Sequence, residues 1–433
     1  MISNQGLPFF LILFLPTLSL LYIISVQSFL AGWHECSWTY LAKPITLRLA
    51  FVVVAIAISI AIPSPSTATT TTTNDNDWLN VQYLFPTILL SIISMITIYR
   101  TRKIFVQGPK PTFKNMNGKV VLITGSNAGI GKETARQLLI MGATVIMACR
   151  SEKRAKEAMD DILRSIHVKR NDDDDEKSQK SAKDRLIFLP CDVSDFNSVR
   201  EAVSTFQKMN LPLDVLINNA GIMMGQRKTT TGDDNGLELT MACNHLGHFL
   251  LTNLLLPTMR KQKDSRVVIV TSSTYVLASD GIDLKDLNCE QKKYTMFSQY
   301  AQSKLANILM GKELLRREQA MMVKSDEEYS PISVFMVHPG LVRTDVVRNM
   351  PWYLKYPNIL FSFILTTLQK SPAAGAYTNV FCATSDEAKQ FNGEYLSNSE
   401  SFPTNDFANN KDDAIELWKL SEEMVGLNKK QSK

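Results

Sequence analysis

Two residues of the 433-residue chain, Tyr300 and Lys304, have the types and the spacing for acid–base chemistry at a carbonyl group. A free tyrosine has a pKa of about 10, so it exchanges protons poorly near neutral pH until a cation favours its phenolate. Side chains four residues apart share one face of a helix. We therefore expect the Lys304 ammonium to lie near Tyr300, to lower its pKa and to make it an acid–base catalyst.

Spacing alone does not single out this pair, because Tyr99 and Lys103 are also four residues apart. Those two residues end a long apolar segment, where an aromatic ring and a cation are typical of a bilayer interface. Tyr300 and Lys304 instead follow a predicted β-strand at 266–272 and begin a predicted helix. The surrounding elements therefore decide which tyrosine we assign to catalysis.

Short apolar runs alternate with helix-length segments from residue 119 onward. The runs are rich in β-branched residues and do not alternate with polar ones, which is typical of parallel strands covered by helices on both faces. We predict an α/β fold with a doubly wound, Rossmann-type parallel sheet. Its strands are expected at 119–124, 143–148, 185–190, 213–218, 266–272 and 332–337.

Glycines follow the first predicted strand, in the run Thr124-Gly125-Ser126-Asn127-Ala128-Gly129-Ile130-Gly131. Between a strand and a helix, glycines permit a tight turn and let the backbone approach a pyrophosphate, whose charge the helix N-terminus stabilises. A plain tight turn is the alternative. We predict a dinucleotide-binding loop that consists of Gly125, Ser126, Asn127, Gly129, Ile130 and Gly131.

The second predicted strand ends in a cation, in the run Ala148-Cys149-Arg150. An acidic residue at this place would bind the ribose hydroxyls of NAD, whereas a guanidinium pairs with a 2′-phosphate. Arg150 therefore predicts NADP(H) rather than NAD(H) as the cofactor. A surface arginine without a ligand is the alternative, because the glycine loop itself contains no basic residue.

Several motifs together resemble the short-chain dehydrogenase/reductase family in their order and approximate spacing. They are the glycine run, Asn218-Asn219-Ala220-Gly221, Asn244-His245-Leu246-Gly247-His248-Phe249, Ser272-Ser273, Tyr300-Ala301-Gln302-Ser303-Lys304 and Pro339-Gly340. The resemblance covers about residues 117–426, and it is strongest to the members related to retinol dehydrogenases and polyprenol dehydrogenases. It implies a catalytic Rossmann domain, to which we assign residues 113–426.

The resemblance implies roles for two further residues beside Tyr300 and Lys304. Ser273 would hydrogen-bond the substrate oxygen, and it is chosen over Ser272 because the family places the second serine of this pair in the site. Asn244 would order a water molecule that completes a proton relay. A strand-end cap is the alternative for Ser273, and an ordinary polar helix position is the alternative for Asn244.

The resemblance also implies residues that contact the cofactor. Lys304 would bind the nicotinamide ribose as well as influence the tyrosine. Asp192 would lie near the adenine, although it could equally cap the helix that follows it. The remaining implied contacts are Asn219 and Gly221 along the adenosine ribose, and Pro339, Gly340 and Thr344 over the nicotinamide.

Charge and cysteine usage argue against two classes of function. The 47 basic and 42 acidic side chains give a net charge of +5, with no basic stripe, so no nucleic-acid partner is expected. The six cysteines lack the short paired spacing of a zinc site or a redox pair. His245 and His248 are expected to be packed or hydrogen-bonded, and no metal site is predicted.

Residues 1–104 are expected to form a membrane region with three transmembrane helices, at 7–30, 45–62 and 81–99. Basic residues lie between the first two segments and directly after the third, which predicts that the catalytic domain faces the cytosol. We expect a multi-pass protein of the endoplasmic reticulum. A cleaved signal peptide is the alternative for the first segment.

Two other segments are unusual in composition. The acidic insertion at 169–184 is expected to be a solvated loop at the sheet edge opposite the ligand crevice. The segment at 351–368 is apolar and corresponds to the variable substrate lid of the family. Core packing and a substrate entrance that dips into the bilayer are both open for this segment, and the second of these indicates a lipophilic substrate.

The sequence therefore predicts a membrane-anchored, NADP(H)-dependent oxidoreductase that interconverts a carbonyl and an alcohol on a retinoid, steroid or polyprenol type of substrate. Its expected partners are this small lipophilic molecule and a lipid bilayer, and homo-oligomer formation is left open. Two alternatives remain. One is a catalytically idle membrane scaffold or cofactor sensor on the same fold, and the other is a carbon–carbon double-bond reductase of the protochlorophyllide reductase type.

Overall fold

The structure is a computed structural model that describes residues 106–167, 182–231, 236–322, 331–342 and 369–428. The three predicted membrane segments, the apolar segment 351–368 and all but the last three residues of the acidic insertion 169–184 lie outside the described residues. Among the helices that the structure describes, none is both long enough and apolar enough to cross a membrane. Contacts divide the chain into two units, and all described residues belong to the second, Leu90–Lys433.

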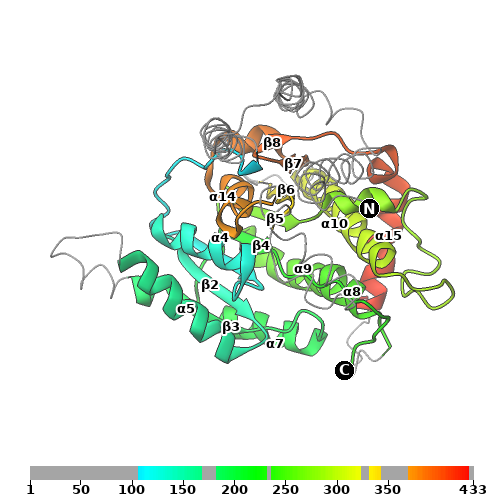
Figure 1. Cartoon of the computed structure of the whole chain (residues 1–433), viewed down its shortest axis with the longest axis horizontal. Helices are drawn as coiled ribbons and strands as arrows, with labels where there is room; N and C mark the ends of the chain where they lie inside the picture. Colours follow the sequence, from blue (N-terminus) through cyan, green and yellow to red (C-terminus); the bar gives the residue numbers. More distant parts are fainter. Residues whose placement is uncertain (1–105, 168–181, 232–235, 323–330, 343–368, 429–433) are drawn as a thin grey trace, which may run out of the picture. The chain divides into compact units, whose positions relative to one another are not determined.

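The described residues contain one eight-stranded sheet with the order β3-β2-β1-β4-β5-β6-β7-β8 (Figure 1). Neighbouring strands are parallel except for β7 and β8, which are antiparallel. The strands are β1 (Val120–Thr124), β2 (Thr144–Cys149), β3 (Leu186–Pro190), β4 (Val215–Asn218), β5 (Arg266–Val270), β6 (Ser333–His338), β7 (Tyr395–Ser397) and β8 (Glu400–Ser401). The strand order reverses between β1 and β4, which is where a doubly wound sheet binds its ligand.

Helices cover both faces of this sheet. One face carries α4 (Gly129–Ile140), α5 (Glu152–His167) and α14 (Tyr377–Thr384), and the other carries α7 (Phe196–Lys208), α9 (Gly247–Met259), α10 (Met296–Met322) and α15 (Lys411–Met424). The shorter elements are α8 (Leu239–Met241), the π-helical turn η2 (Ala242–Leu246), the 3-10 turns η3 (Ser273–Leu277), η5 (Glu387–Phe391) and η6 (Asp406–Asn409), and α13 (Pro372–Gly375).

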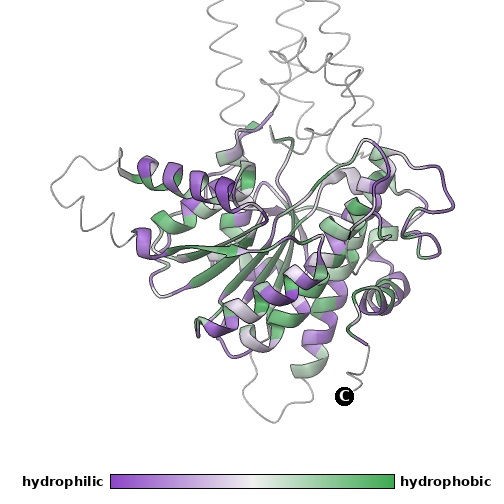
Figure 2. Ribbon diagram, turned by 90° about the horizontal axis from the view of Figure 1, so that it is seen from below, coloured by the Kyte–Doolittle hydropathy of each residue, from purple (hydrophilic) through white to green (hydrophobic). Residues whose placement is uncertain are grey.

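The strand sequences explain why the core has two halves. Successive residues of a strand point to opposite faces, so Leu122 packs with the α7, α9 and α10 side while Ile123 packs with the α4 and α5 side. β1, β4 and β5 are buried at every position, which requires apolar residues on both faces. Figure 2 shows these hydrophobic strands between helices whose outward faces are hydrophilic.

All six strands predicted from the sequence are present, and each observed boundary lies within two residues of the predicted one. The sequence does not predict β7 and β8, which have three and two residues and are too short to show a periodic pattern. β7 forms because it can pair with the long strand β6, where Met336 lies opposite Tyr395. The predicted α/β class and the parallel doubly wound sheet are therefore confirmed, with an added antiparallel edge.

A close contact forms between α9 and the chain that follows β3, at the carboxyl ends of the parallel strands. α9 begins at Gly247, and a Cβ atom at this position would overlap the carbonyl oxygen of Val193. Only glycine allows the helix and this backbone to approach so closely. The same contact places the turn that contains Asn244 directly beside the carboxyl end of β3.

Gly247→Ala is expected to destabilise the domain by about 1–3 kcal/mol or more, because the new methyl group forces two backbone segments apart. The gain in helix propensity, about 1 kcal/mol, is too small to compensate. Gly311→Ala is the matched control, since its Cβ would meet the side chains of Met336 and Ile269 rather than backbone atoms. Urea unfolding measures both variants. An equal loss for the two would contradict the backbone explanation.

Candidate active site

The residues predicted to do chemistry meet at the carboxyl ends of the parallel strands. The glycine loop follows β1, Arg150 follows β2, Asp192 follows β3 and Asn219 follows β4. Ser272 and Ser273 follow β5, and Pro339 and Gly340 follow β6. The topology therefore brings these segments, which are far apart in the sequence, to one edge of the sheet.

Tyr300 and Lys304 lie in the first turns of α10, as the sequence predicts. The Lys304 Nζ atom lies 5.6 Å from the centroid of the Tyr300 ring. It donates a hydrogen bond to the carbonyl oxygen of Val270 at 3.0 Å, and the lysine side chain is buried. This bond joins the first turns of α10 to the last residue of β5.

The expected lowering of the Tyr300 pKa by Lys304 is wrong. Burial raises the pKa of Tyr300 to about 12, and a hydrogen bond with Ser272 offsets only part of this rise. Burial also lowers the pKa of Lys304 to about 8. The ammonium points to the Val270 carbonyl rather than to the phenol, so desolvation dominates. Tyr300 is therefore a neutral proton donor near pH 7, and Lys304 is mostly charged.

The two adjacent serines after β5 have different surroundings. Ser272 is half-buried, hydrogen-bonds Tyr300, and accepts a hydrogen bond from Thr274 Oγ1 at 2.9 Å. Ser273 is exposed, and its backbone N–H donates to Nδ1 of His338 at 3.2 Å. The structure thus places the hydroxyl of Ser272, rather than that of the predicted Ser273, beside the tyrosine.

Asn244 lies in the π-helical turn η2, a kind of helix irregularity that is frequent at functional sites. Its amide clamps Ile222, because Oδ1 accepts from the Ile222 N–H at 2.8 Å and Nδ2 donates to the Ile222 carbonyl at 3.0 Å. Nδ2 also donates to Ser303 Oγ at 3.0 Å, and Ser303 donates to the Tyr300 carbonyl at 2.8 Å. Ser303, which the sequence analysis did not assign, therefore links Asn244 to the tyrosine.

A buried network connects the glycine loop to this turn. Thr124 Oγ1 accepts the backbone N–H groups of Asn219 and Ala220 at 2.9 and 3.0 Å, and it lies 2.8 Å from Nε2 of His248. Nδ1 of His248 lies 3.0 Å from the carbonyl oxygen of Asn244. Burial lowers the pKa of His248 to about 4, so the ring is neutral. His248 is hydrogen-bonded, as expected, and its role is to connect segments.

His245 is held in the same way, with Nε2 2.9 Å from Ser421 Oγ and Nδ1 3.3 Å from Asn307 Oδ1. Burial lowers its pKa to about 4. Within the described part of the chain, no cluster of three or more histidine, cysteine or acidic side chains could hold a metal ion. The five described cysteines are buried free thiols.

The glycine loop fits a dinucleotide in two respects. Gly125 and Gly129 have positive φ angles of 64° and 55°, which glycine adopts without strain. Ala128, at the N-cap of α4, makes no side-chain capping bond, so the helix dipole and the first N–H groups remain available for a phosphate. A Cβ on Gly221 would make ordinary van der Waals contact with Asn244 Oδ1 and Lys304 Nζ, both at 3.5 Å, so Gly221 lies directly beside these two side chains.

Other residues of the predicted loop have packing roles. A Cβ on Gly131 would overlap Asn219 Nδ2, so this glycine permits α4 to contact the β4 loop. Asn219 Nδ2 donates to the Thr124 carbonyl at 2.9 Å, and the Ser126 hydroxyl donates to the Ile123 carbonyl at 3.1 Å. These bonds fix the loop to the carboxyl end of β1. The other two predicted members, Asn127 and Ile130, are half-buried at its rim.

Arg150 lies at the carboxyl end of β2 with 70% of its side chain exposed, and its guanidinium forms an ion pair with Asp192 at 3.5 Å. Asp192 Oδ1 also accepts from the N–H and the hydroxyl of Ser194. Asp192 does not cap α7, because Asp195 occupies the N-cap. The pair therefore lies at the carboxyl ends of β2 and β3, with the cation facing solvent.

Pro339 is buried, and Gly340 has a φ of 87°. A Cβ on Gly340 would approach the Lys370 side chain to 2.9 Å, and the positive φ angle favours glycine at this position. Lys370 is buried, and its backbone N–H donates to the Leu341 carbonyl at 2.8 Å. Thr344, the last predicted cofactor contact, lies outside the described residues.

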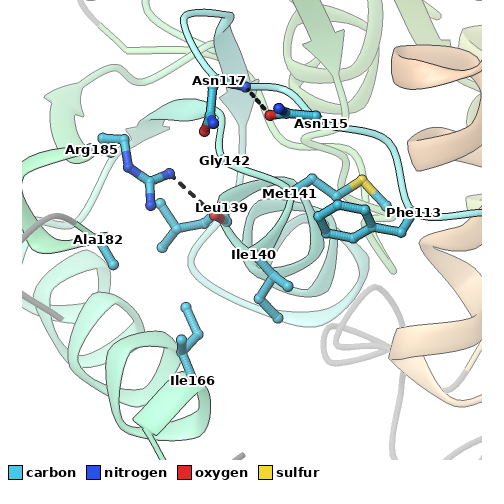
Figure 3. Close-up of a pocket in the computed structure, with 10 residues that line it drawn as sticks. All are labelled: Phe113, Asn115, Asn117, Leu139, Ile140, Met141, Gly142, Ile166, Ala182 and Arg185. Carbon is cyan, nitrogen blue, oxygen red and sulfur yellow. Dashed lines mark hydrogen bonds between the residues drawn. The ribbon is translucent and has the colours of Figure 1, made fainter. Parts of the chain in front are cut away.

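A cavity of about 430 Å³ lies elsewhere, beside the C-terminal end of α4 (Figure 3). Its walls include Phe113, Ile140, Ile166 and Arg185. Arg185 donates hydrogen bonds to the carbonyl groups of Leu139 and Ala143, which gives it a structural role. None of the lining residues belongs to the predicted site, so this cavity is not where the chemistry is expected.

The chain is similar to known proteins in both sequence and structure. A sequence model described as short chain dehydrogenase matches residues 119–172 and 163–282. Human retinol dehydrogenase 14 is 38% identical over 314 residues, which are 72% of this chain and 88% of the relative. Human polyprenol dehydrogenase is 34% identical over 324 residues, which are 73% of this chain and 88% of the relative.

A solved structure of an uncharacterized protein from Mycobacterium paratuberculosis matches with a TM-score of 0.53 and 28% identity, covering 73% of this chain and 98% of that one. The fold therefore agrees with that of this solved structure. The chain belongs to the short-chain dehydrogenase family of oxidoreductases, which use nicotinamide cofactors, and it is related to the retinol and polyprenol dehydrogenases.

Proposed function

We propose that the chain is an NADP(H)-dependent oxidoreductase that interconverts a carbonyl and an alcohol on a lipophilic substrate. The single observation that carries this proposal is the placement of Tyr300, hydrogen-bonded to Ser272 and one helical turn before the buried Lys304. An idle scaffold or cofactor sensor does not require a neutral phenol, a hydroxyl and an ammonium at one place. The arrangement favours catalysis for that reason.

In the reductive direction, Tyr300 donates its phenolic proton to the substrate oxygen, since its raised pKa keeps it protonated near pH 7. The Ser272 hydroxyl hydrogen-bonds the same oxygen and orients it. A bound nicotinamide supplies the hydride in this direction and accepts it in the other. The Lys304 ammonium stabilises the phenolate left at Tyr300 and passes a proton back to it. A water ordered by Asn244 then returns a proton to the lysine.

Arg150 supports NADP(H) over NAD(H). The residue directly follows β2, and β2 ends in Cys149 rather than in a carboxylate. A guanidinium can exchange its exposed ion pair with Asp192 for the stronger charge of a phosphate. Asn219, Gly221, Pro339, Gly340 and Thr344 complete the proposed cofactor contacts.

The substrate is proposed to be an oily alcohol or its carbonyl product. Two relatives are named for retinol and for polyprenol, which are both lipophilic alcohols. The apolar segments at 7–30, 45–62 and 81–99 support attachment to a bilayer, with the catalytic domain on the cytosolic side of the endoplasmic reticulum. The apolar segment 351–368 supports an entrance for such a molecule.

Tyr300→Phe is expected to lower the turnover of a hydrophobic aldehyde by about a hundredfold to ten-thousandfold, because it removes the proton donor. The full chain in nanodiscs should still bind NADPH. Tyr377→Phe, which removes a hydroxyl from α14, serves as the control. Unchanged turnover in Tyr300→Phe would remove this residue from the mechanism.

Chromatography of the product against the authentic alcohol separates carbonyl reduction from double-bond reduction. If the unmodified chain shows no turnover, the scaffold alternative is favoured.

Ser272→Ala and Ser273→Ala form a matched pair at neighbouring positions. Ser272→Ala is expected to lower kcat about tenfold or more, because a hydrogen bond to the reacting oxygen is lost. Ser273→Ala should leave kcat nearly unchanged, since its side chain is exposed and only its backbone is bonded. Steady-state kinetics of both variants check the assignment. The reverse order of effects would restore Ser273 as the catalytic serine.

Arg150→Ala is expected to weaken NADPH binding by about 1–3 kcal/mol, the range for a charged hydrogen bond, and to affect NADH much less. Lys153→Ala removes an exposed cation three residues away on α5 and is the control for general electrostatics. The KM values for both cofactors provide the measurement. Equal effects of Arg150→Ala on NADPH and NADH would contradict the assignment of NADP(H).

A further inference from the structure

His338 ends β6, the strand next to β5, and contacts the turn that carries the two serines. Its Nδ1 atom accepts the backbone N–H of Ser273 at 3.2 Å. That N–H belongs to the peptide group between Ser272 and Ser273. The hydrogen bond therefore restricts the rotation of the peptide that directly follows Ser272.

The imidazole ring of His338 is itself held in place. It stacks on Tyr395 of β7 with an interplanar angle of 9° and a centroid distance of 6.4 Å. Tyr395 is buried and makes an edge contact with Tyr275 at 5.6 Å. Tyr275 is anchored in turn, because its hydroxyl donates to Asn405 Oδ1 at 3.0 Å. The orientation of the histidine thus follows from an aromatic stack behind the site.

His338 remains an acceptor because it stays neutral. Burial and the nearby charge of Lys370 lower its pKa to about 3. A protonated imidazole would carry hydrogen on both ring nitrogens and could not accept the Ser273 N–H. Lys370 is fixed by a hydrogen bond from its Nζ to Asn398 Oδ1 at 2.6 Å. The charge that disfavours protonation is therefore part of the same structure.

We propose that His338 is a positioning residue that holds the peptide after Ser272 and thereby keeps the Ser272 hydroxyl directed at Tyr300 and the substrate oxygen. This proposal rests on the proposed function of Ser272. His338 acts through the serine turn and does not itself touch the reacting atoms. Small displacements of a positioned group reduce a rate steeply, by up to about a hundredfold for 1 Å.

Two substitutions separate hydrogen bonding from packing. His338→Phe keeps a ring that can stack on Tyr395 but has no acceptor, and it is expected to lower kcat about ten- to a hundredfold with the dissociation constant of NADPH unchanged. His338→Asn loses the ring but presents Oδ1 in place of Nδ1, and it is expected to recover most of the lost kcat. Thermal unfolding of both variants in nanodiscs verifies that each one folds.

A double-mutant cycle tests the route of the effect. If His338 acts through Ser272, His338→Phe should cause no further loss of kcat in a Ser272→Ala background. Additive losses, or a kcat of His338→Phe equal to that of the unmodified chain, would overturn the proposal. Equal losses in the Phe and Asn variants would also overturn it, because they would indicate packing alone.

Activity of the unmodified chain distinguishes a failure of the proposed function from a failure of the role proposed for His338. If it turns over no hydrophobic aldehyde or alcohol with either nicotinamide, the proposed function fails and the role of His338 fails with it. If it is active and His338→Phe is equally active, only the role of His338 is overturned.

Discussion

One buried hydroxyl group, that of Thr124, joins the segments on which the candidate site depends. Its oxygen accepts two backbone N–H groups of the β4 loop, and its hydrogen faces Nε2 of His248. Only one tautomer satisfies this arrangement, because the Asn244 carbonyl can only accept and therefore requires the hydrogen on Nδ1. Burial keeps the imidazole neutral, and a fully paired buried network has one low-energy arrangement. This network therefore fixes the position of the glycine loop relative to the turn that contains Asn244.

The parallel sheet could be predicted from the sequence because its strands are buried on both faces. Such strands consist of continuous apolar, β-branched runs, and these runs survive in the sequence as recognisable segments. β7 carries no comparable signal, because three residues gain their conformation from pairing with β6 rather than from their own pattern. The position of Tyr395 behind the site, and with it the stack on His338, therefore becomes visible only in three dimensions.

The site was predictable where a helix sets the geometry and less so where a strand ends. Tyr300 and Lys304 share a helix face, so their proximity follows from their spacing alone. Ser272 and Ser273 differ by one position at the end of β5, where a shift of one residue reverses the side-chain direction. The raised pKa of Tyr300 could not be predicted from the sequence either. Both the burial of its ring and the hydrogen bond from Lys304 to Val270 depend on the assembled fold.

The bond from Lys304 to the Val270 carbonyl explains how a helix residue and a strand-end residue can act on one oxygen atom. Val270 ends β5, and Ser272 follows two residues later, so the bond ties the serine turn to the same α10 turn that presents Tyr300. An ammonium has three hydrogens, and the carbonyl uses one of them. The other two are available for the proposed contacts with the cofactor ribose and with a water molecule. Its conservative replacement by arginine would not be equivalent, because a planar guanidinium cannot make these bonds from a single buried point.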